Sequence, residues 1–341
     1  MNVYHIAFVT DDVFVIPTMV AIQSLKDSQD VINKKYVIHV LGSGISDINK
    51  KKIISLTDEF FEVIIIDVTE KYVAMKLSKV QEHYCTAKSA ALLKFEIADV
   101  LKNIDVLLYL DGDIVVKGDI SPIFNVDLGN AYVAGVRDGG VATYARKNHE
   151  NLGLDFEHYI NSGVMLLNLK KIREENLKEE LYKIKFSLDD KTKMDQNVFN
   201  IVFGRNSEDI KLLPLKYNCT FINDYLESYY GKMDLKTLNE VHNTTYLSWN
   251  QILEDAVVLH YSAPLKPWLY SDTIAVAYWN AAFKKCVPLE NVNLNRKRLH
   301  INFYMKKCNS KYTKLFVRGI LSLETKGFRA TFRKVIRKIF K

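Results

Sequence analysis

The sequence lacks any long hydrophobic run. No uninterrupted apolar stretch approaches the roughly 18 residues that a membrane-spanning helix needs. The first apolar run, residues 3–10, has no basic segment before it and is too short for a signal-peptide core followed by a cleavage site. We therefore expect neither a membrane span nor a secretory signal, and we interpret this run as a first strand.

Cysteine is scarce and scattered. The four cysteines, Cys85, Cys219, Cys286 and Cys308, lie too far apart in the sequence for a zinc knuckle or a redox pair. We therefore expect no disulfide bonds and a reducing, cytoplasmic environment. Internal repeats and low-complexity linkers are absent as well.

The composition that remains is typical of a folded soluble protein, with 48% hydrophobic and 26% charged residues among 341. This length favours one large domain with a smaller appendage. The net charge of +7 is unevenly distributed, because residues 294–341 carry 15 Lys or Arg and one acidic residue, whereas the first 293 carry 32 basic and 39 acidic residues. We therefore divide the chain into a body, residues 1–270, and a basic C-terminal region, residues 271–341, which favours an anionic partner.

Hydrophobic patterning predicts that strands and helices alternate. Strands are expected over residues 3–10, 36–41, 62–66, 106–110, 131–136, 158–169 and 256–261, and helices over 17–26, 46–60, 87–101, 170–182 and 195–203. Residues 211–249, rich in Tyr and Asn, are expected to form loops beside a ligand site. The alternation predicts an α/β fold with one mainly parallel sheet and helices on both faces.

The strongest chemical signal follows the strand predicted over residues 106–110. This strand ends in Asp111, Gly112 and Asp113. Residues two apart on an extended chain point the same way, so both carboxylates can face one cation, and the glycine lets a ligand approach the backbone. Ligands of open α/β sheets bind at this end of the strands. An ordinary Asp-Gly turn accounts for the same residues equally well, so the motif alone leaves both interpretations open.

Six segments repeat a known pattern in order. They are AFVTDD at residues 7–12, YLDGD at 109–113, YINSGVMLLNL at 159–169, DQN at 195–197, LPLKYN at 213–218 and HYSAPLKPW at 260–268. Together they resemble the family 8 retaining glycosyltransferases, which include bacterial lipooligosaccharide galactosyl- and glucosyltransferases and, more distantly, glycogenin. The resemblance covers most of the chain, from about residue 6 to residue 268.

The resemblance implies a glycosyltransferase A type fold, a UDP-hexose donor and a divalent cation. It makes Asp111, Asp113 and His260 the metal ligands. Hard carboxylate oxygens suit Mg²⁺ or Mn²⁺, and one imidazole favours Mn²⁺. A lone histidine near a buried strand is more commonly a core residue, but the neighbouring Lys266-Pro267-Trp268 favours the ligand role. Lys266 would join the metal in stabilising charge on the departing phosphate, unless it is an ordinary solvated lysine.

The resemblance also implies a binding site for the nucleotide. It places Val9, Thr10 and Asp11 against uracil and ribose, although Asp11 also suits a simple turn. Lys94 aligns where the family often has an arginine, and a lysine cannot make the planar, two-pronged contact of an arginine. Ala263 stands where related sequences commonly have a glycine next to the diphosphate, and Gly112 belongs to the same nucleotide-binding set.

Around the donor hexose the resemblance implies Asp138, Asn161, Asp195 and Gln196. The two aspartates suit sugar hydroxyls, and Asp195 also suits the first turn of a helix. Gln196 would lie near the anomeric carbon, but an amide is a poor nucleophile. We therefore expect a front-face substitution, in which the departing phosphate oxygen takes the proton of the acceptor hydroxyl, with Gln196, Asp195 and Lys266 as the catalytic residues.

The C-terminal region ends in an amphipathic pattern. The apolar residues Phe328, Phe332, Val335, Ile336, Ile339 and Phe340 recur at helical spacing, with Arg329, Arg333, Lys334, Arg337, Lys338 and Lys341 between them. Such a helix suits the surface of an anionic leaflet, where each basic residue contributes on the order of 1 kcal/mol. The alternative is a terminal helix that packs on the body with a solvated basic face. No nucleic-acid-binding motif accompanies the charge, so we expect no nucleic-acid partner.

The sequence therefore predicts a cytoplasmic, Mn²⁺-dependent retaining hexosyltransferase, peripheral on the inner face of the plasma membrane. It would move glucose or galactose from UDP to a glycan or glycolipid acceptor, such as lipopolysaccharide core or a lipid-linked saccharide. One alternative is a metal-dependent nucleotidyltransferase, but its usual Gly-rich phosphate-binding segment near the first strand is missing. The other is a non-catalytic basic membrane- or nucleic-acid-binding protein on a transferase scaffold.

Overall fold

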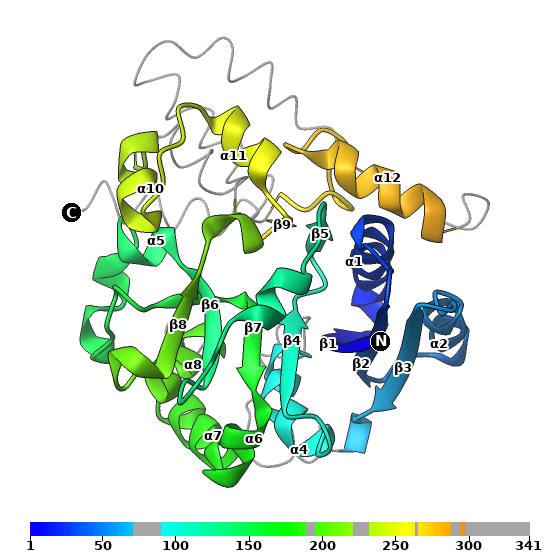
Figure 1. Cartoon of the computed structure of the whole chain (residues 1–341), viewed down its shortest axis with the longest axis horizontal. Helices are drawn as coiled ribbons and strands as arrows, with labels where there is room; N and C mark the ends of the chain where they lie inside the picture. The colour runs from blue at the N-terminus through cyan, green and yellow to red at the C-terminus, as the bar shows by residue number, and fades with distance from the viewer. Residues whose placement is uncertain are drawn as a thin grey trace, which may run out of the picture.

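The centre of the molecule is a seven-stranded sheet in the order β3-β2-β1-β4-β7-β6-β8 (Figure 1). The computed structural model describes residues 1–70, 90–188, 195–220, 232–262 and 265–287, together with Leu294 and Arg296. The strands of the sheet are β1 (Asn2–Asp11), β2 (Lys34–Ser43), β3 (Phe61–Asp67), β4 (Val106–Leu110), β6 (Val133–Arg137), β7 (Ile160–Asn168) and β8 (Ile210–Leu213). Only β7 runs antiparallel to its neighbours β4 and β6, and the other pairs are parallel. The predicted mixed, mainly parallel sheet is confirmed.

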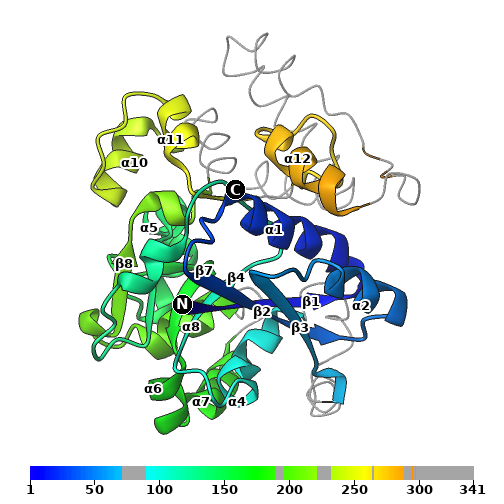
Figure 2. The same ribbon diagram turned by 45° about the vertical axis from the view of Figure 1, so that its right-hand side comes forward.

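Helices cover both faces of this sheet, as predicted. Figure 2 shows α1 (Val15–Ser28) and α12 (Val276–Cys286) on one side, and α4 (Ile97–Val100), α6 (Leu169–Glu174) and α7 (Leu177–Ser187) on the other. The remaining α-helices of the described ranges are α2 (Asp47–Ile54), α5 (Gly139–Ala142), α8 (Asp195–Phe203), α10 (Leu235–His242) and α11 (Trp249–Asp255). None of the helices in these described ranges combines the length and the apolar character needed to cross a bilayer.

The sheet divides the core into two layers. Ile6 and Phe8 of β1 pack on the side of α1, whereas Ala7 and Val9 pack on the side of α8. Successive side chains of a strand point to opposite faces, and both faces here are covered by helices. The central strands are therefore nearly continuous apolar runs, which is why the sequence located them.

Three predicted helices differ in extent. The helix expected over 46–60 ends at Ile54, because Oδ1 of Asp58 accepts the N–H groups of Phe60 and Phe61 at 3.0 and 2.9 Å and turns the chain into β3. The helix expected over 170–182 is divided into α6 and α7 at Asn176, whose φ of 52° is left-handed. Of residues 87–101, a 3₁₀ helix covers Ala90–Glu96 before α4, and residues 87–89 lie outside the described ranges.

The expectation of loops over residues 211–249 is wrong in part. Most of β8 and all of α10 lie there. The edge strand β8 has only four residues and is fixed by pairing with β6, so its sequence gives little periodic signal. α10 begins where the Asp234 side chain accepts the N–H of Thr237 at 2.7 Å. Residues 221–231 lie outside the described ranges.

The last predicted strand does not join the main sheet. β9 (Val258–His260) pairs antiparallel with β5 (Ile114–Val116) in a separate two-stranded ribbon. Register places Ile114 opposite His260. A histidine from late in the sequence is thereby brought beside the residues that follow β4.

The helix α12 packs on the body of the molecule. It lies against α1, and its Trp279 is fully buried and stacks on Phe283 at 4.9 Å between ring centroids. The basic amphipathic pattern predicted over residues 328–340 lies outside the described ranges.

Candidate active site

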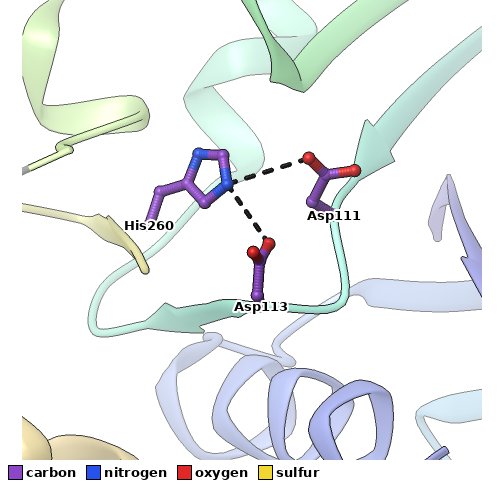
Figure 3. Close-up of side chains that lie close together, drawn as sticks. All are labelled: Asp111, Asp113 and His260. Carbon is purple, nitrogen blue, oxygen red and sulfur yellow. Dashed lines mark ion pairs between the residues drawn. The ribbon is translucent and has the colours of Figure 1, made fainter. Parts of the chain in front are cut away.

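Three side chains that can bind a metal meet at the carboxyl end of β4 (Figure 3). Asp111 follows β4 directly, Asp113 precedes β5, and His260 ends β9. Nε2 of His260 lies 3.2 Å from Oδ1 of Asp113 and 3.7 Å from Oδ2 of Asp111. The three ligand atoms all lie within 4.8 Å of one another. The structure thus brings the three predicted ligands together, although the turn at Gly112 and Asp113 replaces the extended geometry on which the prediction relied.

Two glycines make this arrangement sterically feasible. A Cβ at Gly163 of β7 would lie 2.2 Å from Cε1 of His260 and 2.9 Å from Oδ2 of Asp111. Only glycine therefore lets the imidazole pack over β7 and still reach the carboxylates. A Cβ at Gly112 would lie 2.6 Å from Oγ1 of Thr18, so this glycine is also needed for packing against α1.

The acidic pair is held by polar partners on both sides. The Tyr109 hydroxyl donates to Oδ1 of Asp111 at 2.6 Å, and Nζ of Lys266 lies 2.6 Å from Oδ2 of Asp113. Burial raises the pKa of Asp113, but Lys266 and His260 outweigh burial and hold it well below its usual range. Asp113 is therefore a carboxylate. Lys266 is an ion-pair partner of the acidic pair, and its side chain is 19% exposed, unlike a solvated surface lysine.

Lys94 links the acidic pair to α8. Its Nζ lies 2.7 Å from Oδ2 of Asp195 and 2.9 Å from Oδ1 of Asp111, and its side chain is 3% exposed. Burial lowers the pKa of Lys94, but Asp111 and Asp195 raise it above its usual range. Burial raises the pKa of Asp195, but Lys94 outweighs burial and lowers it. The lysine acts here as a point charge between two carboxylates, a role that needs no planar fork.

An amide cluster lies beside these charges. Nε2 of Gln196 donates to Oδ2 of Asp138 at 2.9 Å and to the Tyr159 hydroxyl at 3.2 Å. Oε1 of Gln196 accepts from Nδ2 of Asn161 at 3.1 Å. Three of the residues predicted around the hexose are thus in mutual contact, and Asp195 precedes Gln196 at the start of α8.

A cavity of about 400 Å³ connects the acidic pair with the amide cluster. Ten predicted residues line it: Val9, Thr10, Lys94, Asp111, Gly112, Asp113, Asn161, Asp195, Gln196 and His260. Asp11, Asp138 and Lys266 are not part of its lining, and Ala263 lies outside the described ranges. The sequence analysis missed Phe14, Ala91, His149, Tyr159, Ser162, Asn197 and Ser262, which also line the cavity. Four of these, Tyr159, Ser162, Asn197 and Ser262, stand inside the quoted motifs, which could have identified them.

The end of β1 contributes one wall. Val9 and Thr10 line the cavity, but Oδ1 of Asp11 accepts the N–H of Phe14 at 2.9 Å and caps the 3₁₀ turn Asp12–Phe14. Asp11 thus has the turn role that its sequence allowed, and its contact with uracil stays a prediction. The Phe14 ring packs edge-on against Trp268, with 5.3 Å between ring centroids.

The residues present fit a divalent cation. Two carboxylates and one imidazole are a donor set of the hard, partly nitrogenous kind that suits Mn²⁺ or Mg²⁺. Nδ1 of His260 lies 2.9 Å from Oδ1 of Asn218, so its Nε2 is the ring atom left to face the carboxylates. A Cβ at Gly163 would occupy the space in which His260 and Asp111 approach each other.

The fold and the site define an α/β protein in which two carboxylates and an imidazole that can hold a cation lie at the carboxyl end of β4, next to a polar cavity. A family model described as glycosyl transferase family 8 matches residues 5–272, and the chain belongs to this family. The resemblance found in the sequence is therefore confirmed.

Individual relatives are similar over part of their length. The chain is 30% identical to a lipopolysaccharide 1,2-glucosyltransferase of Escherichia coli over 60% of this chain and 59% of that protein. It is 24% identical to a lipopolysaccharide 1,3-galactosyltransferase of Salmonella typhimurium over 61% of this chain and 60% of that protein. The chain spans about three fifths or less of the length of three curated relatives that it matches.

Solved structures share the fold. The galactosyltransferase LgtC, in complex with donor and acceptor sugar analogs, superposes with a TM-score of 0.65 at 22% identity, over 84% of this chain and 98% of that chain. The bifunctional glycosyltransferase WbbM superposes with a TM-score of 0.68 at 20% identity, over 83% of this chain and 50% of that chain. The predicted glycosyltransferase A type fold is confirmed.

Proposed function

We propose that the protein is a retaining glycosyltransferase that moves glucose or galactose from UDP to a glycan acceptor such as lipopolysaccharide core or a lipid-linked saccharide. The observation that carries this proposal is the presence of the Asp111, Asp113 and His260 set, the Lys94 bridge and the Gln196 cluster around one cavity. Membership of family 8 and the activities for which the relatives are named support it.

In the proposed reaction each charged group has a separate task. Asp111, Asp113 and His260 would hold Mn²⁺, or Mg²⁺, which when bound supplies Lewis-acid stabilisation of the diphosphate. Lys266, an ion-pair partner of Asp113, adds a positive charge at the same end of the donor. Val9 and Thr10 line the part of the cavity proposed for the nucleotide, and the adjacent Phe14 ring offers an apolar surface to the base.

The sugar would lie against the amide cluster. Both hydrogens of the Gln196 amide are donated, to Asp138 and Tyr159, and its oxygen accepts from Asn161 and from the N–H of Ser162. Gln196 lines the cavity at this position, but an amide is a poor nucleophile and would not attack the sugar. The bond from the anomeric carbon to the phosphate oxygen therefore breaks while the acceptor oxygen bonds on the same face, and the acceptor proton passes to the departing phosphate.

Incubation of the purified protein with UDP-glucose or UDP-galactose, with Mn²⁺ or with a chelator, tests this function. We expect Mn²⁺-dependent release of UDP and transfer to an acceptor in a glycan panel, detected by mass spectrometry, with the anomeric configuration retained by NMR. Asp113→Asn should abolish turnover, whereas Asp127→Asn, on an exposed loop, should not. Absence of hydrolysis or transfer with every UDP-sugar contradicts the proposal, and pyrophosphate release from a nucleoside triphosphate favours the nucleotidyltransferase instead.

We further propose that residues 271–341 act as a basic appendage that holds the catalytic body, residues 1–270, at the anionic cytoplasmic leaflet. The charge excess of residues 294–341 supports this proposal. A lipid-linked acceptor would then be presented at the surface where the protein binds.

A further inference from the structure

The LPLKYN segment has no role in the function described so far. Its last residue, Asn218, follows the 3₁₀ turn Leu215–Tyr217 and is 2% exposed. Oδ1 of Asn218 lies 2.9 Å from Nδ1 of His260, and its Nδ2 lies 2.9 Å from Oδ1 of Asn161. A buried amide therefore connects the cation-binding histidine with the amide cluster at the other end of the cavity.

The direction of these hydrogen bonds is fixed by the backbone. The N–H of Gly163 points at one amide atom of Asn161, at 3.0 Å, and a backbone N–H can only donate, so that atom is the oxygen. The Asn218 group that faces this oxygen must be its NH₂. Its oxygen then faces the ring of His260, and an amide oxygen can only accept, so Nδ1 of His260 carries the hydrogen.

The far end of the chain of bonds is consistent with this direction. Nδ2 of Asn161 lies 3.3 Å from Oδ2 of Asp138, and a carboxylate accepts hydrogen bonds. The N–H of Ser162 lies 3.3 Å from Oε1 of Gln196, which turns the NH₂ of that amide toward Asp138 as well. Every donor in the chain from His260 to Asp138 points the same way.

We propose that Asn218 is a positioning residue, which holds His260 as the Nδ1–H tautomer, with Nε2 facing Asp111 and Asp113, and ties it to the amides of the sugar site. This inference rests on the proposed function, because it gives His260 the role of a metal ligand. Ligand histidines generally donate their second ring nitrogen to such a partner, and loss of the partner reduces metal affinity or activity roughly 10- to 100-fold.

Three variants separate this role from a general contribution to stability. Asn218→Leu removes both hydrogen bonds, whereas Asn218→Asp retains an acceptor for Nδ1–H of His260 but cannot donate to Asn161. Asn239→Leu removes a partly buried asparagine whose hydrogen bonds to described residues lie within the segment around α10, so it serves as the matched control.

The tautomer is read from ¹⁵N NMR of the metal-free protein, with the His260 signals identified by comparison with His260→Gln. Mn²⁺ affinity is measured by calorimetry. We expect Asn218→Leu to lose the fixed Nδ1–H pattern and to bind Mn²⁺ roughly 10- to 100-fold more weakly. Asn218→Asp should retain the pattern with a downfield Nδ1–H proton and keep more Mn²⁺ affinity than Asn218→Leu, because an acceptor for Nδ1–H remains, but turn over more slowly. The control should match the wild type in both measurements.

The inference is wrong if folded Asn218→Leu keeps the Nδ1–H pattern and the Mn²⁺ affinity, or if Asn239→Leu weakens Mn²⁺ binding as much. If Asn218→Leu does not fold, an unchanged Nδ1–H proton in Asn218→Asp overturns the inference. If the wild-type protein turns over no UDP-sugar, the proposed function is wrong. The tautomer of His260 and the Mn²⁺ affinities of the variants would still test the role of Asn218.

Discussion

At the scale of single residues, the site depends on close approach as much as on chemistry. His260 reaches the acidic pair by lying over β7 at Gly163, where no side chain fits. The Gly163 carbonyl also accepts the N–H of Asp111 at 2.8 Å. Gly163 thus aligns Asp111 by its backbone and admits His260 by having no side chain.

We expect Gly163→Ala to lower Mn²⁺ affinity at least about tenfold while the fold is retained, because the added Cβ must displace His260 or Asp111. Gly118→Ala is the control, since a Cβ there comes no closer than 3.6 Å to another atom. Calorimetric titration with Mn²⁺ compares the two. Equal Mn²⁺ affinities of the two variants would show that Mn²⁺ binding does not require the observed position of His260.

A second residue-scale prediction concerns Lys94. Its removal in Lys94→Met leaves Asp195 buried without its cation, which should reduce the free energy of unfolding by about 3–5 kcal/mol at pH 7. In the wild type the pKa of Asp195 is lowered, so its contribution to stability is present above the unfolded pKa and is lost as pH falls. In the variant, burial raises this pKa, so the protonated form stabilises the fold at low pH and this contribution is lost as pH rises.

The stability difference between wild type and Lys94→Met should therefore shrink on acidification from pH 7 toward pH 4. Urea unfolding followed by circular dichroism measures it, and Lys94→Arg, which keeps the charge, should show a smaller loss. A difference that does not change with pH would contradict this account of the pair.

At the scale of elements, the β5 and β9 ribbon brings His260 to Asp111 and Asp113. Its three register pairs, Ile114 with His260, Val115 with Leu259 and Val116 with Val258, align residues far apart in the sequence. All six residues are buried. Packing of this small ribbon, outside the main sheet, therefore sets the separation of His260 and Asp113.

Two matched cavity variants test this role. Ile114→Ala in the ribbon and Ile53→Ala in α2 each remove a side chain of 0% exposure, so each should reduce the free energy of unfolding by about 2–5 kcal/mol. We expect only Ile114→Ala to weaken Mn²⁺ binding as well. Urea unfolding and calorimetry on both variants check this, and an equal effect on Mn²⁺ binding would remove the special role of the ribbon.

At the scale of the whole molecule, charge separates the body from its C-terminal region. Residues 294–341 carry an excess of Lys and Arg, whereas the first 293 residues have a net negative charge. The Asp111, Asp113 and His260 set of the body suits a cation, whereas a basic sequence favours an anionic partner, so the two parts suit different ligands.

We expect the triple variant Arg329→Gln, Arg333→Gln and Arg337→Gln to bind vesicles of phosphatidylglycerol and phosphatidylethanolamine about 100-fold more weakly, since each basic residue contributes roughly 1 kcal/mol at such a surface. The control Lys50→Gln, Lys51→Gln and Lys52→Gln removes the same charge from α2. Co-sedimentation at low and high salt measures binding. If both triple variants bind alike, the C-terminal region is not the membrane-binding part.

How much of the fold and of the site could be predicted from the sequence depends on the type of sequence pattern. The strands β1, β2 and β4 contain apolar runs that are largely buried on both faces, and local pattern identifies such runs. The edge strand β8 and the break at Asn176 depend on pairing and on a single left-handed residue, which periodicity does not register. Asp111 and Asp113 could be identified because they directly follow a predicted strand. The role of Asn218 depends on contacts with His260 and Asn161, which are distant in the sequence.

By itself, the sequence determined which residues are chemically able to act, because carboxylates, imidazole and amides keep their donor and acceptor properties in any fold. Only the tertiary structure decided which of them meet. His260 and Asp113 are joined by pairing between β5 and β9, Lys94 lies between Asp111 and Asp195, and the Nδ1–H of His260 follows from a backbone N–H on β7. Contacts and hydrogen-bond directions arise from packing between distant segments, which no local stretch of the chain encodes.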